Sequence, residues 1–167
     1  MRSRRTALPW LIAAVLVAAF LLTRGGDRPF PSFAGAPSAR VQRVVDGDTV
    51  RLAGLGSVRL IGVDTPEVYG HVECFGPEAS AFAKSVLRRG ARVRYRVGSE
   101  AHDRYGRLLA YVWLGDGRLF NRMLVERGYA TTLTIAPNDQ LARSFRAAEA
   151  GARRKRAGMW RHPGCAS

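Results

Sequence analysis

Acidic and basic side chains recur in short turn segments of this chain, in a combination that could cut a phosphodiester bond. The first segment is Asp46-Gly47-Asp48-Thr49, and Arg59 follows it. The next is Asp64-Thr65-Pro66-Glu67, and the last is Asp103-Arg104-Tyr105-Gly106-Arg107. Carboxylates can hold a divalent cation, arginines can clamp a phosphate, and a glutamate can handle a proton. The pattern therefore indicates a reaction as well as a fold.

Three aspartates are the candidate metal ligands, because hard divalent cations prefer several oxygen ligands. Asp48 and Asp64 are the main candidates, Asp46 would support them, and the backbone carbonyl of Thr65 could add another oxygen. The alternative is turn chemistry, because Asp-Gly-Asp and Asp-Thr-Pro are also common turn and strand-exit sequences. Asp46 in particular could simply cap its turn.

Two arginines and one glutamate are the candidate catalytic residues. Arg59 and Arg107 can each hold a phosphate in a bidentate way without losing charge. Glu67 is the candidate general base, and Arg104 and Tyr105 are candidate substrate contacts in the same turn as Arg107. For any one of these charged residues alone, a surface ion pair is the competing interpretation.

The elements that must position these residues can be predicted from patterning. Apolar and β-branched runs predict strands at 41–45, 49–52, 57–63, 91–97 and 107–114. The strand at 91–97 alternates strictly, with Ala91, Val93, Tyr95 and Val97 facing the core and three arginines facing outward.

Three helices are expected around these strands. One begins at Pro77 and ends before Gly90, and a second spans Phe120 to Arg127. Asn138 is expected to cap a third, whose apolar stripe is Leu141, Phe145, Ala148 and Ala152. Five strands with one helix after the third and helices at the end indicate an α+β protein, an OB-fold five-stranded β-barrel with three helices.

The chain is strongly basic, with a formal net charge of +14. The five arginines and one aspartate before residue 40 account for only +4 of it, so the remainder belongs to the folded domain. Such a domain attracts polyanions, and binding should weaken as salt rises. A solvated basic surface without a nucleic-acid partner is the alternative.

The N-terminus has the pattern of an export segment. Arginines precede an uncharged apolar run from Ala7 to Leu22, which is typical of a signal peptide or a signal-anchor helix. We therefore expect residues 1–23 to be that segment, 24–39 to be a flexible linker, and 40–167 to be the domain. The protein would be extracytoplasmic, either secreted or anchored to the membrane, and monomeric.

The two cysteines, Cys74 and Cys165, are consistent with export. They lie far apart in the sequence, so they form no local metal motif. In an oxidising compartment they are expected to form a disulfide, with two free thiols as the alternative.

Several segments together resemble the signature of the staphylococcal (micrococcal) nuclease family, the thermonucleases. They run in order through residues 45–50, 59–60, 63–67, 76–79, 103–107 and 158–160. The resemblance implies an OB-fold and a calcium-dependent phosphodiesterase acting on DNA and RNA, with 3′-phosphate ends as products. Single strands are expected to be preferred, because the cleft must reach the phosphate from the base side. It implies Ca²⁺ ligation by Asp48, Asp64 and the Thr65 carbonyl, with Asp46 in support. Glu67 would activate water, and Arg59 and Arg107 would neutralise the phosphate.

One departure from the family pattern concerns the nucleotide. The family often has tyrosines before its Pro-Asn pair, whereas residues 131–136 here contain none before Pro137-Asn138. Weaker base stacking is therefore expected. Two alternatives to the nuclease are a non-catalytic nucleic-acid-binding OB module tethered at the membrane and a tethered structural or interaction domain.

Overall fold

The computed structural model of this chain describes residues 33–165. The predicted signal peptide or anchor and most of the predicted linker lie outside the described residues. Within the described range, no helix combines the length and the apolar character that crossing a membrane requires. The predictions for the export segment and the linker therefore stay predictions.

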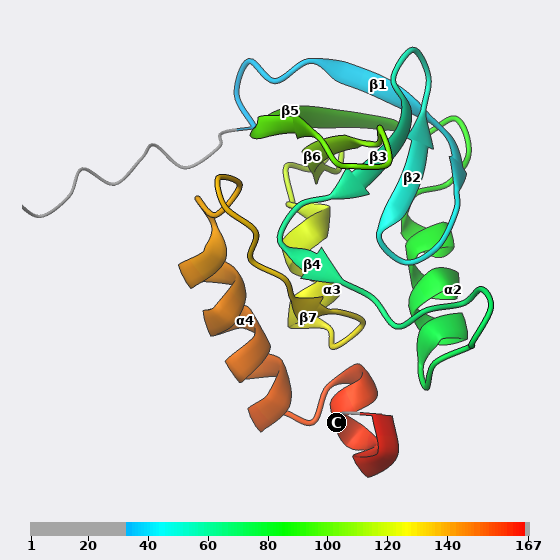
Figure 1. Cartoon of the computed structure of the whole chain (residues 1–167), viewed down its shortest axis with the longest axis vertical. Helices are drawn as coiled ribbons and strands as arrows, with labels where there is room; N and C mark the ends of the chain where they lie inside the picture. The colour runs from blue at the N-terminus through cyan, green and yellow to red at the C-terminus, as the bar shows by residue number, and fades with distance from the viewer. Residues whose placement is uncertain (1–32, 166–167) are drawn as a thin grey trace, which may run out of the picture. The chain divides into compact units, whose positions relative to one another are not determined.

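Five strands close into a barrel in the order β1-β2-β3-β6-β5 (Figure 1). The pairs are antiparallel except β3 with β6, which is parallel. Alternate side chains point inward, so apolar residues such as Val50, Val58 and Val112 are fully buried in one core. The strands are Ser38–Val44, Thr49–Leu52, Gly56–Leu60, Arg92–His102 and Leu108–Trp113, for β1, β2, β3, β5 and β6. The predicted five-stranded OB-type barrel is confirmed.

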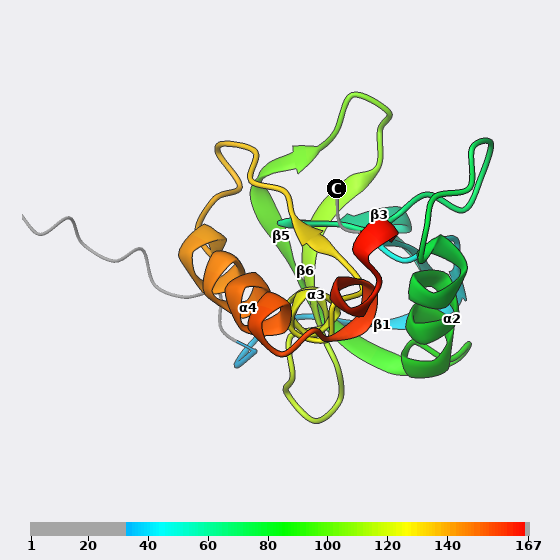
Figure 2. The same cartoon turned by 90° about the horizontal axis from the view of Figure 1, so that it is seen from below.

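In the described part of the chain, three α-helices accompany the barrel: α2 (Gly76–Val86), α3 (Phe120–Glu126) and α4 (Ala142–Arg154). Figure 2 shows α3 between α2 and α4. Phe120 and Leu124 of α3 are completely buried in the barrel core, so this short helix contributes to the core itself. Two 3₁₀ turns, η1 (Gly158–Arg161) and η2 (Pro163–Cys165), follow α4. The three predicted helices are confirmed.

A small second sheet was not predicted. It pairs β4 (Val63–Asp64) with β7 (Thr131–Thr132). The predicted strand 57–63 is divided because Gly62 has a φ of +82°, a backbone conformation that turns the chain out of the barrel. This turn separates β3 from β4, and thus Arg59 from Asp64, while keeping both near the same end of the barrel.

Replacing Gly62 with alanine is expected to destabilise the protein by roughly 2 to 4 kcal/mol. An alanine would carry the unfavourable positive φ, and its Cβ would run into the buried ring of Phe145. Urea unfolding should show a lower midpoint with an unchanged slope. Gly54→Ala is the matched control, because Gly54 has a φ of +80° but open space around it. An equal loss in the two variants would contradict the role of the Phe145 contact.

Two local predictions are wrong. Asn138 does not cap α4, because that helix begins at Ala142, directly after Leu141. The side chain of Asn138 instead bonds the backbone of Glu100. Its Oδ1 accepts from the Glu100 amide at 3.1 Å, and its Nδ2 donates to the Glu100 carbonyl at 2.9 Å. Val97 is not a core residue but is 37% exposed, because the β5–β6 register becomes irregular after it. The apolar stripe of α4 is buried as predicted.

The disulfide between Cys74 and Cys165 is present, with Cα atoms 5.0 Å apart. The predicted pairing is confirmed. It joins the segment before α2 to the end of η2, so the C-terminal turns are covalently fixed to the loop that follows Glu67.

Candidate active site

The loop between β1 and β2 is organised by Asp46. Its Oδ1 accepts hydrogen bonds from the backbone amides of Asp48 (3.1 Å) and Thr49 (2.6 Å). Gly47 allows the close approach of this loop to Thr65, since a Cβ at Gly47 would lie 2.6 Å from the Thr65 side chain. Asp46 thus caps the turn, as the alternative interpretation of the sequence allowed, and in doing so it positions Asp48.

Asp48 is a buried carboxylate, only 6% exposed. Its Oδ2 accepts hydrogen bonds from the amide (2.8 Å) and the hydroxyl (2.9 Å) of Thr65. Burial raises the pKa of Asp48 to about 6, and the charge of Asp46 acts in the same direction; Arg59 and the Thr65 hydrogen bonds partly offset this. An ionised carboxylate at this position therefore needs a cation beside it.

Arg59 provides that positive charge in the described structure. Its Nη1 lies 2.5 Å from Asp48 Oδ2 and donates to the carbonyl of Val63 at 3.1 Å. Its Nη2 lies 2.6 Å from Oδ1 of Asp64, whose side chain is 53% exposed. One guanidinium thus bridges the two carboxylates that were predicted to bind a metal.

The buried Asp48 should make the stability of the metal-free protein depend on pH. Since its pKa is higher in the folded state (about 6) than the ordinary 3.8, the folded state binds more protons between these values, and its stability falls as pH rises through them. The full effect is roughly 3 kcal/mol. Urea unfolding in chelator at pH 4 and pH 7 should show that Asp48→Asn removes most of this dependence. An identical pH profile in the two proteins would contradict it.

Arg107 is held by an aspartate whose role was not predicted from the sequence. Asp103 Oδ2 accepts from Arg107 Nε at 2.7 Å, and its Oδ1 accepts from the backbone amides of Tyr105 and Arg107 at 2.9 Å each. Burial alone would raise the pKa of Asp103, but the hydrogen bonds from Arg107 and Tyr105 outweigh it and lower the pKa. The Asp-x-x-Gly turn was the available signal, because aspartate side chains commonly bond the backbone two residues on.

The other two residues of this turn are exposed. The Arg104 guanidinium donates to the Tyr105 hydroxyl at 2.6 Å, and the Tyr105 ring is 67% exposed. The guanidinium carbons of Arg104 and Arg107 lie 4.8 and 5.4 Å from the centre of that ring. The predicted substrate contacts therefore form one cationic and aromatic surface beside Arg107.

Glu67 lies in the loop between β4 and α2, with an exposed side chain and a fixed backbone. Its amide donates to Glu73 Oε2 (3.0 Å), and its carbonyl accepts from the amide of Glu73 (2.9 Å). The hydroxyl of Tyr69 in the same loop donates to the carbonyl of Val45 at 2.8 Å, which ties this loop to the one that carries Asp48. Glu73 and Tyr69 are positioning residues that the sequence did not reveal.

The structure brings the predicted catalytic residues, and all of the predicted metal ligands except Asp64, to one small polar cavity of about 100 Å³. It is lined by Asp46, Asp48, Arg59, Thr65, Pro66, Glu67 and Arg107. Asp64 does not line it and reaches the cavity only through its ion pair with Arg59. Carboxylates and guanidinium groups from four separate segments thus converge on a space large enough for a hydrated ion or a phosphate oxygen.

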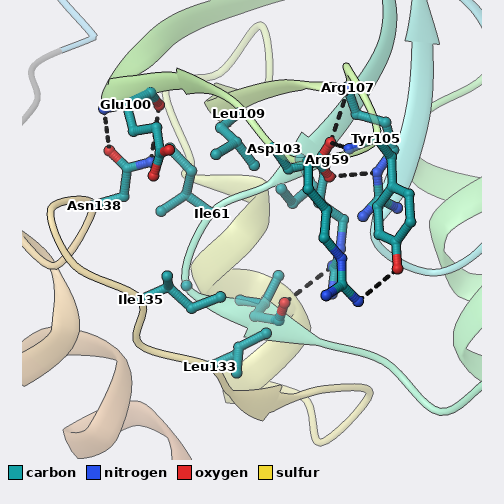
Figure 3. Close-up of a pocket in the computed structure, with 14 residues that line it drawn as sticks. Arg59, Ile61, Glu100, Asp103, Tyr105, Arg107, Leu109, Leu133, Ile135 and Asn138 are labelled. Carbon is teal, nitrogen blue, oxygen red and sulfur yellow. Dashed lines mark hydrogen bonds and ion pairs between the residues drawn. The ribbon is translucent and has the colours of Figure 1, made fainter.

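A larger cavity of about 480 Å³ shares Arg59 and Arg107 with the small one. Figure 3 shows Arg59, Arg107, Asp103 and Tyr105 together, with Leu133 and Ile135 facing them from the segment that follows β7. Among the described residues of its lining, Tyr105 is the sole aromatic side chain. Leu133 and Ile135 are 38% and 59% exposed, so this cavity combines cations on one side with exposed apolar side chains on the other.

The chemistry of the donor set fits a hard divalent cation. The small cavity is lined by residues with oxygen donors, namely Asp46, Asp48, Thr65 and Glu67. No cysteine or histidine is among its described lining residues, and such an all-oxygen set is what hard cations prefer. Nowhere in residues 33–165 do three carboxylate, imidazole or thiol side chains form a ready cluster. The guanidinium of Arg59 lies between Asp48 and Asp64 and pairs with both.

Comparisons with known proteins show the family of the chain. A sequence model of the family described as "Staphylococcal nuclease homologue" matches residues 57–162 of this chain. The thermonuclease of Staphylococcus intermedius is 38% identical over 159 residues, which cover 90% of this chain and 94% of that protein. The thermonuclease of Staphylococcus hyicus is 36% identical over 172 residues, which cover 96% of this chain and 99% of that protein.

A third relative is much longer than this chain. The endonuclease YhcR of Bacillus subtilis (strain 168) is 40% identical over 144 residues, which cover 78% of this chain but only 12% of that protein. The similarity to YhcR is thus confined to one part of it.

Proposed function

Because this chain belongs to the staphylococcal nuclease family, we propose that it is a calcium-dependent nuclease that hydrolyses phosphodiester bonds of DNA and RNA. Nuclease activity is supported by the family and by relatives that are named thermonuclease or endonuclease. The observation that carries the proposal is the convergence of Arg59 and Arg107 with Asp48 and Glu67 on one small cavity. The presence of Asp48 and Glu67 in one cavity with two arginines favours a catalyst over a module that only binds nucleic acid.

The side chains of this cavity divide the work of hydrolysis. Arg59 and Arg107 bind two non-bridging oxygens of the phosphate and neutralise the negative charge that grows in the transition state. Asp103 holds Arg107 in position through the hydrogen bond to its Nε. The exposed carboxylate of Glu67 accepts a proton from the attacking water.

A divalent cation would be held by the carboxylate of Asp48 and the carbonyl of Thr65, two residues of the small cavity, with Asp46 supporting the loop. The carboxylate of Asp64, which lies outside the cavity lining but shares Arg59 with Asp48, would be the further ligand. When bound, the cation supplies Lewis-acid polarisation of the phosphate oxygens. Calcium is the choice because the donors are all oxygens and because Ca²⁺ tolerates irregular coordination. In the described structure Arg59 pairs with both of these carboxylates.

The larger cavity can receive the nucleoside next to the phosphate that is cut. Leu133, Ile135 and Tyr105 offer apolar and aromatic surface to a base, with little hydrogen-bonding capacity to select one base over another. We propose single strands as the preferred substrate and 3′-phosphate ends as the product. The site would act outside the cytoplasm, on a monomer that is secreted or anchored through its N-terminal segment.

The test is digestion of single-stranded DNA and of RNA by the full chain, with calcium and with excess chelator. Cleavage with calcium, none in chelator, and phosphatase-sensitive 3′ ends would support the proposal. Full activity in chelator would refute the metal dependence, and binding without cleavage would favour the tethered OB module. Binding of neither polymer would favour a structural domain.

A further inference from the structure

A second strongly basic surface lies outside the cavities described above. It is a groove of about 800 Å³ between the β1–β2 hairpin and the C-terminal end of α2. Its lining carries five exposed cationic side chains and, among the described residues, no aspartate or glutamate. We call it the basic groove and define it by Arg40, Arg43, Arg51, Lys84 and Arg89.

The strand register places part of the basic groove on the same sheet face as the active site. Arg43 of β1 is directly opposite Arg51 of β2. In the next pair of strands, Arg51 and Thr49 of β2 are opposite Ser57 and Arg59 of β3, respectively. Directly opposed residues point to the same face of a sheet, and so do residues two apart on one strand. Arg43, Arg51 and Arg59 therefore form a row on one face across three strands, with the uncharged Thr49 and Ser57 between Arg51 and Arg59. The row ends at Arg59, which lines the catalytic cavity.

The row carries a cost for the protein on its own. Arg43 and Arg51 are like charges on directly opposed residues, an arrangement that destabilises a sheet. Neither arginine forms an ion pair within residues 33–165. The side chain of Arg40 donates a hydrogen bond to the carbonyl of Gly90 at 3.1 Å and likewise has no acidic partner in this range. A polyanion lying in the basic groove would remove this repulsion.

We infer that the basic groove is a second binding site for the substrate's phosphate backbone, several nucleotides away from the bond that is cut. This inference rests on the proposed nuclease function and adds to it a preference for long strands over short ones. A nucleic-acid strand fits better than a membrane surface, because Arg43 and Arg51 share a sheet face with Arg59, which lines the catalytic cavity. Moreover, none of the large exposed apolar side chains in the described structure lies in the basic groove, so the groove lacks the apolar surface that inserts into a lipid bilayer.

The test compares Arg43→Gln/Arg51→Gln with a control that loses the same charge elsewhere. Arg118→Gln/Arg122→Gln is that control, since each of its arginines pairs with an exposed acid and neither lines the basic groove. The substrates are a thymidine dinucleotide, which has one phosphodiester, and an oligo(dT) of about 40 nucleotides, longer than one OB domain covers.

On the long strand, we expect kcat/KM of the groove variant to fall about tenfold at low salt. The slope of log(kcat/KM) against log salt concentration should become shallower by about 1.4, which is ~0.7 for each lost phosphate contact. On the dinucleotide, both variants should match the wild type within about twofold. Equal losses on the two substrates, or a long-strand loss no greater than in the control, would overturn the inference.

Two further measurements separate this inference from its premise and from a membrane role. Binding of oligo(dT), measured by fluorescence anisotropy in a Glu67→Gln background, should weaken with the groove substitutions even if no cleavage is found in the wild type. Such weakening without cleavage would support the basic groove as a nucleic-acid-binding site and refute the proposed nuclease activity. If the substitutions abolished binding to phosphatidylglycerol vesicles while leaving oligo(dT) binding unchanged, the basic groove would be a lipid surface and the inference would be wrong.

Discussion

Asp48→Asn is expected to lower kcat/KM for single-stranded DNA by about a thousandfold or more in saturating calcium, because a bound metal supplies several kcal/mol of transition-state stabilisation. Asparagine has the size of aspartate and keeps an oxygen for the amide and hydroxyl of Thr65. It lacks the charge that a divalent cation requires. The buried position, only 6% exposed, leaves water little room to replace the lost ligand.

The fold should survive this substitution, since the charge of Asp48 is unfavourable in the metal-free protein near neutral pH. Circular dichroism should be unchanged, and calcium should no longer raise the Tm. Asp116→Asn is the matched control: Asp116 also sits in a turn and pairs with an arginine, Arg118, but at the surface away from the site. Activity above about a tenth of wild type in Asp48→Asn would show that this carboxylate does not hold the metal.

The parts of the fold that could be predicted are those that depend on local sequence patterns, such as apolar periodicity and the residues at helix ends. Alternating and continuous apolar runs gave the five barrel strands, and the Pro77 and Gly90 positions gave the limits of α2 to within a few residues. The β4–β7 pair could not be predicted, because two-residue strands have no periodicity and their pairing depends on the turn at Gly62. Asn138 was misassigned because a cap sequence does not reveal a competing backbone partner such as Glu100.

The candidate site divides in the same way. Residue types in turns and on a strand identified Asp48, Glu67, Arg107 and Arg59, and the structure brings these four to one cavity. The residues that position them act through contacts across the fold or through turn geometry. Tyr69 reaches the carbonyl of Val45, and nothing in the local sequence around either residue indicates that hydrogen bond. Nor did the sequence indicate that Arg59 would bridge both carboxylates, since that requires the turn between β3 and β4.

The second large effect concerns Arg59, which is expected to oppose calcium binding and to promote catalysis. Its guanidinium pairs with Asp48 and Asp64, the carboxylates that a cation would need. A divalent ion placed beside a fixed positive charge is repelled by it. Arg59→Gln should therefore bind calcium about tenfold more tightly in the absence of nucleic acid, as measured by isothermal titration calorimetry at pH 8.

The same variant should lose about 100- to 1000-fold in kcat, the range found when one donor to a developing oxyanion is removed. Arg107→Gln should lose a similar factor in kcat without tighter calcium binding, because its partner is Asp103 and not a predicted metal ligand. The two arginines line the same cavity and carry the same charge, so they are controls for each other. Weaker calcium binding in Arg59→Gln would mean that the guanidinium organises the carboxylates for the ion instead of competing with it.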